Sequence, residues 1–335
     1  MEKSRQSIRA KKRIGLMLLL LLLMIVVGIL GGSSRITLTD FRELFSGQEL
    51  TAAGRIILYV RLPRVAGAVI AGMALAVAGA VIQTVLNNPL AGPNIIGVNS
   101  GAGFAAVLCG VLLPKSYLAL PAAAFAGAFL TVLFVFYLGK KTGSSKITLI
   151  LAGVAINSFL GGATDAVNTF SQESLIAANA FKIGGLNGVN ANILKFASIL
   201  VIVAVVAVLL FHNELEILSL GEETAKTLGL PVSFYRFLFL MLAAVLSGAA
   251  VSFAGLLGFV GLIVPHIARF LVGEESKDFI LSSAVLGALF LLICDTIART
   301  CFAPFELPVG IILSFVGAPF FIWLLFHRKR RNRNA

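Results

Sequence analysis

Fifty consecutive residues without a charge separate Arg64 from Lys115, and this run limits what the chain can become. A water-soluble fold of this length has nowhere to bury so much apolar surface. Uncharged runs of roughly 20 residues recur along the chain, and that length crosses a lipid bilayer as an α-helix. Of the 335 residues, 59% are hydrophobic and 13% charged, and the mean hydropathy is +0.99. The sequence therefore predicts a polytopic membrane protein.

The apolar runs are continuous, which argues against a transmembrane β-barrel, whose strands alternate apolar and polar residues over segments of roughly ten. Charges and helix breakers instead delimit ten expected transmembrane helices in an all-α fold. Two of them lie on either side of "NNPLAGPN", residues 87–94, whose prolines and asparagines break a helix. The other eight are expected at about residues 14–30, 117–138, 147–164, 192–211, 234–253, 256–271, 279–299 and 308–326. A short surface helix is expected within the polar residues 31–60.

Basic residues indicate the orientation of these spans. Ten spans place both termini on one side, and with the N-terminus inside, 18 of the 27 Lys and Arg residues fall on cytoplasmic segments. The chain then divides into a cytoplasmic basic tail (1–13), a single transmembrane domain (14–326) and a second cytoplasmic basic tail (327–335). The first apolar run lacks an A-x-A-like cleavage site and exceeds a usual signal-peptide core, so we expect it to remain as the first span.

Small residues fill the second span, "AGAVIAGMALAVAGAVIQ" (66–83), and allow neighbouring helices to approach closely on several faces. This helix is therefore expected at the centre of the bundle. The seventh span has a similar concentration of small residues, in "AAVLSGAAVSFAGLLG" (243–258). The similarity indicates an inverted internal repeat, as many transporters have.

Motifs for several activities are missing. The chain has no G-x-x-x-x-G-K-[ST] motif, so we do not expect it to bind ATP through a P-loop. It has neither H-E-x-x-H nor G-x-S-x-G, and its three cysteines form no C-x-x-C pair, so no catalytic residue, cofactor or metal site is expected. The net charge of +12 is explained by basic tails that face an anionic lipid leaflet rather than by nucleic-acid binding.

Ionisable residues at membrane depth are few. Asp295 is followed four residues later by Arg299, so an intrahelical ion pair is expected in the ninth span. A proton-driven carrier would carry more buried carboxylates than this. The shortage favours an energy source outside the chain.

A short acidic segment, "SLGEETAKTLGLP" (219–231), interrupts the apolar sequence. Ser219 and Glu222 have the spacing of a capping box, and Glu222 and Lys226 have that of an i,i+4 ion pair. The glycine and proline near its end stop a helix. These signals predict a helix of about two turns, over roughly residues 219–230, in the cytoplasm.

This helix is expected to place Leu218, Ala225 and Leu228 on one face. A helix of two turns is unstable alone in water, so it needs a surface to dock on. That surface is either the chain's own bundle or another protein, and the residues by themselves leave both open.

Eight sequence blocks together resemble the FecCD-type permeases, the membrane subunits of bacterial ABC importers for ferric siderophores, haem and cobalamin. The resemblance covers about residues 35–326, and it is specific as a combination although each block alone is weak. The blocks, in chain order, are "RLPR", "NNPLAGPNIIGVNSGAGF", "LILAGVA", "LGEETAKTLGLP", "GFVGLIVPHIAR", "CDTIAR", "ELPVGI" and "GAPFFIWLL".

The resemblance implies a multi-pass protein of the bacterial cytoplasmic (inner) membrane that is not itself an enzyme. Its implied partners are membrane lipid, a second permease (an identical copy or a close paralogue), two ATPase subunits that bind ATP and Mg²⁺, and an extracytoplasmic substrate-binding protein. A path between the two permeases, lined in part by the fifth span, would carry the cargo by alternating access.

Two groups of residues match functional positions of the family. The acidic segment resembles the coupling helix that sits in a cleft of the ATPase, which assigns ATPase coupling to Gly221, Glu222, Ala225, Leu228 and Gly229. Outer arginines that dock carboxylates of the binding protein match Arg61, Arg64 and Arg299. The second assignment competes with the Asp295–Arg299 pair, because it points Arg299 outward.

Two alternatives remain open at this point. The chain could be an ion-coupled secondary transporter or channel that works without an ATPase, which uptake by the chain alone in proteoliposomes would favour. It could also be a membrane scaffold or sensor that moves nothing. The cargo is not determined by the sequence, because siderophores, haem and cobalamin are handled by similar permeases.

Overall fold

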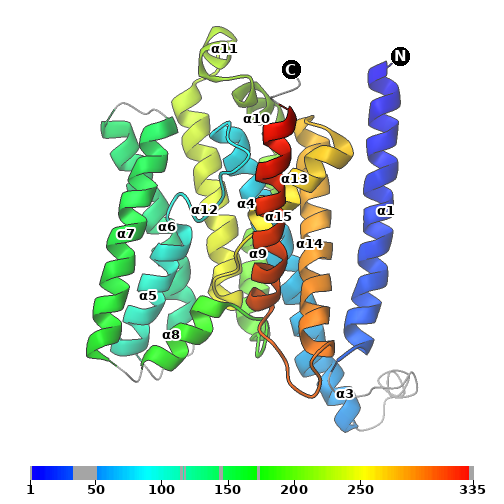
Figure 1. Ribbon diagram of the computed structural model, residues 1–335, viewed down its shortest axis with the longest axis vertical. Helices are drawn as coiled ribbons and strands as arrows, with labels where there is room; N and C mark the ends of the chain where they lie inside the picture. The colour runs from blue at the N-terminus through cyan, green and yellow to red at the C-terminus, as the bar shows by residue number, and fades with distance from the viewer. Residues whose placement is uncertain are drawn as a thin grey trace.

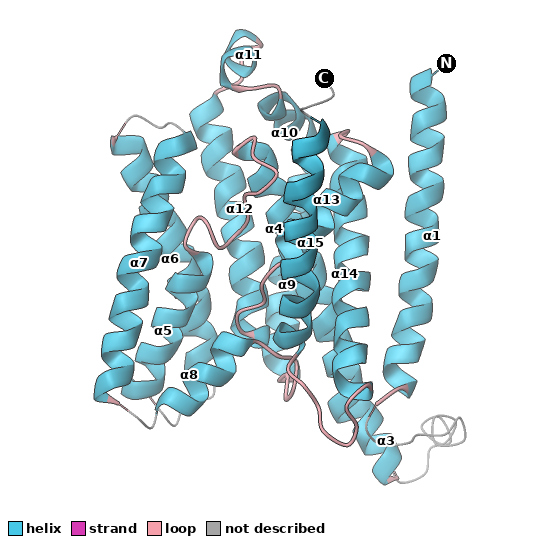
Figure 2. Ribbon diagram, in the orientation of Figure 1, coloured by secondary structure: helices cyan, strands magenta, loops and turns pink. Residues whose placement is uncertain are grey.

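The computed structural model of the chain describes residues 2–32, 51–113, 116, 118–142, 146–171 and 174–331. All regular secondary structure within them is helical, as Figure 2 shows, so the predicted all-α class is confirmed. In chain order the elements are α1 (Glu2–Leu30), α3 (Ala52–Ile56), the π-helical turn η1 (Ile57–Arg61), α4 (Leu62–Val85), α5 (Val98–Leu112), α6 (Ala119–Lys141), α7 (Lys146–Phe170), α8 (Ser174–Ile183), α9 (Ala191–Leu210), α10 (His212–Ser219), α11 (Glu222–Thr227), α12 (Val232–Ala254), α13 (Val260–Val272), α14 (Ser276–Thr300) and α15 (Val309–Arg331).

Seven helices of the described chain are long and apolar enough to cross a membrane. They are α1, the continuous rod α3–η1–α4, α6, α7, α9, α12 and α14. Three shorter apolar helices, α5, α13 and residues 309–324 of α15, occupy the positions of the other expected spans. The polytopic class is confirmed. Seven helices of the described residues meet the length of a span, so the count of ten stays a prediction. The 13 residues of α13 extend only about 20 Å, which is less than the hydrocarbon core of a bilayer.

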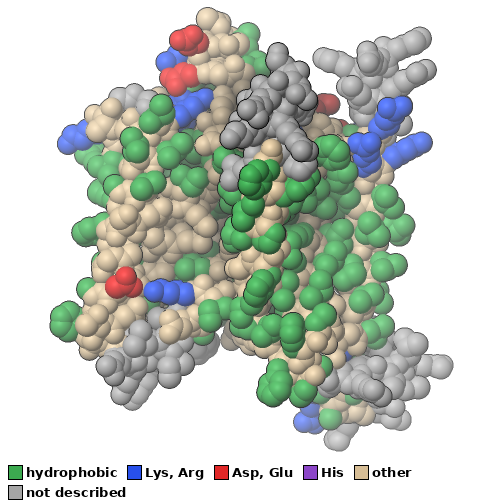
Figure 3. All heavy atoms as spheres, in the orientation of Figure 1, with side chains coloured by type: hydrophobic (Ala, Val, Ile, Leu, Met, Phe, Trp, Pro, Cys, Tyr) green, Lys and Arg blue, Asp and Glu red, His purple; other side chains and the backbone are tan. Residues whose placement is uncertain are grey.

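The long helices run roughly parallel, and Figure 1 shows α10, α11 and both chain ends at one end of the bundle. α3 and α8 lie at the opposite end. Hydrophobic side chains are dense over the centre and right of the face in Figure 3, whereas most charged side chains lie toward the two ends. This distribution fits a bundle whose middle lies in lipid.

α4 lies at the centre of the bundle, as its small residues predicted. It packs against α9, α12, α13 and α14, and 78% of the apolar window in its rod is buried. Two crossings bring backbones into contact. A Cβ atom on Gly72 would lie 2.2 Å from the carbonyl oxygen of Gly287 in α14, and one on Gly79 would lie 1.9 Å from that of Gly261 in α13. Only glycine permits helices to approach this closely.

Non-helical segments account for the two short helices α5 and α13. Residues 86–97, which include the predicted break "NNPLAGPN", connect α4 to α5. Residues 255–259 connect α12 to α13, where the sequence predicted a break among glycines. Both breaks are confirmed, and the second delays α13 to Val260, four residues after the expected start of its span.

Other boundaries differ from the sequence expectation. α7 continues to Phe170, beyond the expected end near residue 164, and α8 was not anticipated. Residues 52–61, expected as part of an external segment, are helical and continue directly into α4. The rest of the expected surface helix falls on residues 33–50, outside the described part of the chain.

We predict that Gly79→Val destabilises the protein because its side chain would overlap the backbone of Gly261, which cannot move without shifting α13. Overpacking of this kind costs about 1–3 kcal/mol. The measurement is the apparent melting temperature in detergent. Gly110→Ala is the control, because a Cβ atom there meets nothing within 4 Å and alanine favours the helix. Equal melting temperatures for wild type and Gly79→Val would contradict the packing.

Candidate coupling helix and outer arginine cluster

Residues 219–231 form the end of one helix and a second, shorter helix rather than the single helix predicted. Ser219 is the last residue of α10, and its hydroxyl donates to the carbonyl oxygen of Glu216 at 2.6 Å. The chain then turns at Gly221, which has φ of 105°, and α11 begins at Glu222. The predicted capping box is therefore wrong, because Ser219 bonds backward into its own helix and Gly221 is the N-cap of α11.

The C-terminal end of α11 is closed by Gly229, as the sequence predicted. Gly229 has φ of 81°, and its amide donates to the carbonyl oxygen of Lys226 at 2.9 Å. The amide of Leu230 donates to the carbonyl oxygen of Ala225 at 3.0 Å. These two bonds form a Schellman motif, whose left-handed residue is most often glycine. Pro231 follows as the N-cap of α12.

Glu222 forms two ion pairs that fix α11. One carboxylate oxygen lies 2.8 Å from Nζ of Lys226, so the predicted i,i+4 pair is confirmed. The other lies 2.8 Å from Nη2 of Arg236 in α12, a side chain that is almost fully buried. Hydrogen bonds from Lys226, which has the larger effect, and from Arg236 lower the pKa of Glu222 from 4.5 to about 2. The sequence did not reveal Arg236 as a partner, because it lies in another helix beyond a proline.

The predicted apolar face of this segment is partly wrong. Leu218 and Ala225 are buried in the bundle core, so the chain's own bundle is the docking surface for these two side chains. Leu228 is 59% exposed, because it stands at the C-terminal cap where the chain already turns away. Leu220, on the turn before α11, is 58% exposed. The segment is thus anchored by one apolar side chain on α11 and presents two leucines to solvent beside its acidic first turn.

The pH dependence of this anchoring follows from the lowered pKa of Glu222. A carboxylate whose folded pKa lies below its ordinary value contributes its full stabilisation above about pH 4.5 and loses it as the pH falls toward about 2. We expect hydrogen-exchange protection of residues 222–230 to stay constant from pH 8 to pH 5 and to fall below that. Glu222→Gln should lower protection throughout and remove this pH dependence. A loss of wild-type protection above pH 5 would contradict the assignment.

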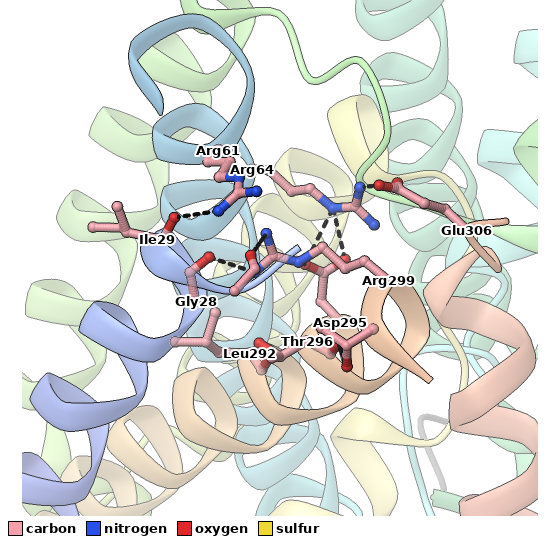
Figure 4. A network of polar contacts seen from close by, with 11 residues as sticks. Gly28, Ile29, Arg61, Arg64, Leu292, Asp295, Thr296, Arg299 and Glu306 are labelled. Atoms are coloured by element: carbon pink, nitrogen blue, oxygen red, sulfur yellow. Dashed lines mark hydrogen bonds and ion pairs between the residues drawn. The ribbon is translucent and has the colours of Figure 1, made fainter. Parts of the chain in front are cut away.

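At the opposite end of the bundle, a buried cluster of charges joins α4, α14 and the loop after α14. Nε of Arg64 lies 3.0 and 3.1 Å from the two carboxylate oxygens of Asp295, and its Nη1 bonds Glu306. Asp295 also lies 3.2 Å from Nε of Arg299, so the predicted intrahelical pair is confirmed. Figure 4 shows Arg64 between the two carboxylates. The single carboxylate of Asp295 thus neutralises part of two buried guanidinium charges.

Two arginines of this region hold the end of α1. Arg61 donates from Nη1 to the carbonyl oxygen of Ile29 at 3.0 Å. Arg299 donates to those of Gly28 at 2.7 Å and Gly31 at 3.1 Å, and Figure 4 shows both guanidinium groups turned toward α1. The last carbonyls of a helix have no partner within it, and cations at this end also complement the helix dipole. The arginines therefore fasten α1, whose apolar window is only 17% buried.

This geometry corrects the expected surface position of the docking arginines. Arg61, Arg64 and Arg299 are 3%, 5% and 2% exposed, with side chains engaged inside the protein. Their guanidinium groups need the buried oxygens, because an unpaired charge in the interior is costly. Docking by these side chains stays a prediction, and their burial argues against it. Glu306 was not assigned a role from the sequence, because its partner Arg64 lies more than 200 residues away.

We predict that Asp295→Asn lowers the free energy of unfolding by about 3–5 kcal/mol, because it leaves two buried arginines without their shared carboxylate. Thermal unfolding in detergent measures this. Asp165→Asn is the matched control: its pair with Lys182 is longer, at 3.8 Å, and the carboxylate is 78% exposed. We expect that control to change stability little. Equal effects of the two substitutions would contradict a structural role for the cluster.

Two cavities border α15. The one toward α10 has a volume of about 870 Å³, and its lining includes Gln83, Asn87, Ser219, Arg269 and Trp323. The other has a volume of about 730 Å³ and lies along residues 310–319, beside the end of α8. Among the described residues, no group of three or more His, Cys, Asp or Glu side chains could hold a metal ion. The two cavities border opposite ends of α15.

Comparisons with known proteins extend over nearly the whole chain. A model of the FecCD transport family matches residues 19–327. The chain is 36% identical over 328 residues to the hemin transport system permease protein HmuU of Yersinia pestis, covering 96% of this chain and 98% of that protein. It is also 36% identical over 330 residues to the Fe(3+)-citrate import system permease protein YfmD of Bacillus subtilis, with the same coverage. A solved structure described as an inward-facing metal-chelate type ABC transporter matches with a TM-score of 0.83 and 29% identity, over 95% of this chain and 99% of that one.

Proposed function

The chain belongs to the FecCD transport family, and from this premise we propose that it is the membrane-spanning permease subunit of an ATP-driven importer for a ferric siderophore or related metal chelate. The observation that carries the proposal is the match along 96% of the chain to permeases for hemin and for ferric citrate. Both of those cargoes are iron chelates. The chain itself performs no catalysis in this proposal, and ATP with Mg²⁺ is bound by separate ATPase subunits.

In the proposed topology the chain spans the membrane ten times, with both termini and α11 in the cytoplasm. Support comes from the basic terminal tails and from the common position of the termini and α11 in Figure 1. A long helix, a non-helical break and a short helix occur twice, as α4–α5 and as α12–α13. The two short helices lie toward opposite ends of the bundle, which supports an inverted repeat.

The proposed assembly contains a second permease packed near α7. Only 17% of the apolar window of α7 is buried, the same share as in α1. The two exposed surfaces differ in part, because α1 presents many leucines whereas α7 presents small residues such as Ala155 and Ser158 between large apolar ones such as Phe159. Leucines suit contact with lipid, and small residues suit close contact with another helix or passage of a cargo. α7 therefore fits the interface and the path between two permeases.

In the proposed mechanism, α11 is the element that the ATPase subunits move. Gly221 and Gly229 permit the turns that bound the helix, while Glu222 and Ala225 attach it to the bundle. Leu228, with its exposed apolar side chain, faces the ATPase. Closure of the ATPase subunits on ATP then displaces α11 and rocks the helices between outward-open and inward-open states. A substrate-binding protein delivers the cargo at the opposite end.

We predict that Leu228→Asp abolishes co-purification of the ATPase subunits and ATP-dependent uptake, because it places a charge in the apolar contact that the exposed leucine would make. The chain should still enter the membrane and keep its melting temperature, since the side chain is exposed. Lys141→Asp is the control, with a new carboxylate at another exposed position at the cytoplasmic end of α6.

Uptake of radioactive ferric citrate and of haem by proteoliposomes separates the proposal from an ion-coupled carrier. The proposed importer requires ATPase subunits and internal ATP. Uptake at the full rate by the chain alone would overturn the proposal. Association of ATPase subunits with Leu228→Asp at wild-type levels would instead move the contact to another part of the surface.

A further inference from the structure

Asn87 stands at the end of α4 in a conformation that usually belongs to glycine. Its φ is 46°, in the left-handed region. Its amide donates to the carbonyl oxygen of Thr84 at 3.1 Å, and the next amide, of Asn88, donates to that of Gln83 at 3.0 Å. This is the same Schellman ending that Gly229 provides for α11. Glycine adopts this conformation at lower cost than asparagine, so the contacts of the Asn87 side chain offset the difference.

The side chain of Asn87 joins three separate helices. With the amide oriented so that every atom finds a complementary partner, its nitrogen donates to the carbonyl oxygens of Thr84 at 2.9 Å and Ser219 at 3.2 Å. Its oxygen accepts from Nζ of Lys146 at 2.7 Å. Ser219 is the last residue of α10, and Lys146 is the first residue of α7. One amide therefore links the end of α4 to the ends of α10 and α7.

The connection continues along α7. The segment that follows Asn87 is fastened to this helix again, because Nδ2 of Asn157 donates to the carbonyl oxygen of Asn94 at 2.8 Å. Ser100, at the start of α5, bonds the same Asn157 side chain at 2.5 Å. Between these points a Cβ atom on Gly153 would lie 2.0 Å from the carbonyl oxygen of Ile95. Residues 86–97 therefore contact α7 at its beginning and again well within the helix.

The other partner of Asn87 leads directly to α11. Only Leu220 and Gly221 separate Ser219 from the first residue of α11. Glu222 and the buried side chain of Ala225 attach α11 to the bundle, and Asn87 links the end of α10 to the end of α4. Because Asn87 bonds the backbone of Ser219, any displacement of the end of α10 either moves Asn87 or breaks this bond.

We propose that Asn87 is a positioning residue that transmits displacement of α10 and α11 to α7 through the segment 86–97. The inference rests on the proposed function, because it assumes that a partner moves α11 and that α7 borders the transport path. It goes beyond that function in naming the mechanical link. Without the side chain of Asn87, α11 can move while α7 stays in place, so ATP is hydrolysed without a matching opening of the path.

Asn87→Gly tests this link cleanly, because glycine keeps the left-handed end of α4 and removes only the amide. Wild type, Asn87→Gly and the control Asn88→Ala are reconstituted in full complexes with the ATPase subunits and the binding protein of the same organism. The side-chain oxygen of Asn88 accepts a hydrogen bond from Leu90 within the same loop, so its removal leaves the link intact. The measurement is the amount of haem or ferric citrate imported per ATP hydrolysed, together with the melting temperature of each complex.

We expect Asn87→Gly to lower import per ATP about fivefold, a magnitude typical of coupling between sites, at an unchanged melting temperature. Asn88→Ala should keep the wild-type ratio. Lys146→Met is a second variant, which leaves Asn87 in place and removes its hydrogen bond to α7. It should lower import per ATP as well. A loss of stability without a change in this ratio would indicate that Asn87 only ends α4, which overturns the proposal.

The outcomes separate the link from the function on which it rests. If the wild-type complex imports neither haem nor ferric citrate with ATP, the proposed function fails, whatever the variants do. If the wild type imports one of them and both Asn87→Gly and Lys146→Met keep its import per ATP, the proposed function stands and the link is refuted.

Discussion

The close approach of the α4 backbone to α13 and α14 is the constraint on which the rest of this structure depends. At Gly72 and Gly79 the neighbouring backbones take the space that a side chain would fill. This contact places α4 at the centre, so its two ends become the points where other elements meet. Arg64 near one end reaches the Asp295 carboxylate of α14, and Asn87 at the other reaches α10 and α7.

The two ends of α4 differ in how firmly they are held. The outer charges are buried, and removing one partner of such a cluster costs about 3–5 kcal/mol. At the inner end Asn87 is exposed, and a single hydrogen bond contributes about 0.5–1.5 kcal/mol. Breaking one of these hydrogen bonds therefore costs less than removing one partner of the charge cluster.

Local patterns predicted a substantial part of the candidate site. The Glu222–Lys226 and Asp295–Arg299 pairs follow from a spacing of four residues on a helix, and the stop at Gly229 follows from glycine before proline. Other predictions were less successful. Ser219 bonds back to Glu216 and does not cap α11, and Leu228 is exposed because it stands at the C-terminal cap. The arginines expected at the outer surface are buried, because most of the groups that they bind lie far away in the sequence.

The sequence by itself determined the membrane class, the all-helical fold, the breaks after α4 and α12, and a short helix in the acidic segment. These properties follow from hydropathy, from the residues that end helices and from contacts within one turn, all of which are local. Only the tertiary structure decided that Arg236 and Glu306 complete ion pairs and that Asn87 joins three helices. The physical reason is that a helix end or a buried charge is satisfied by whichever group packing brings within hydrogen-bond distance, and packing is set by the whole bundle.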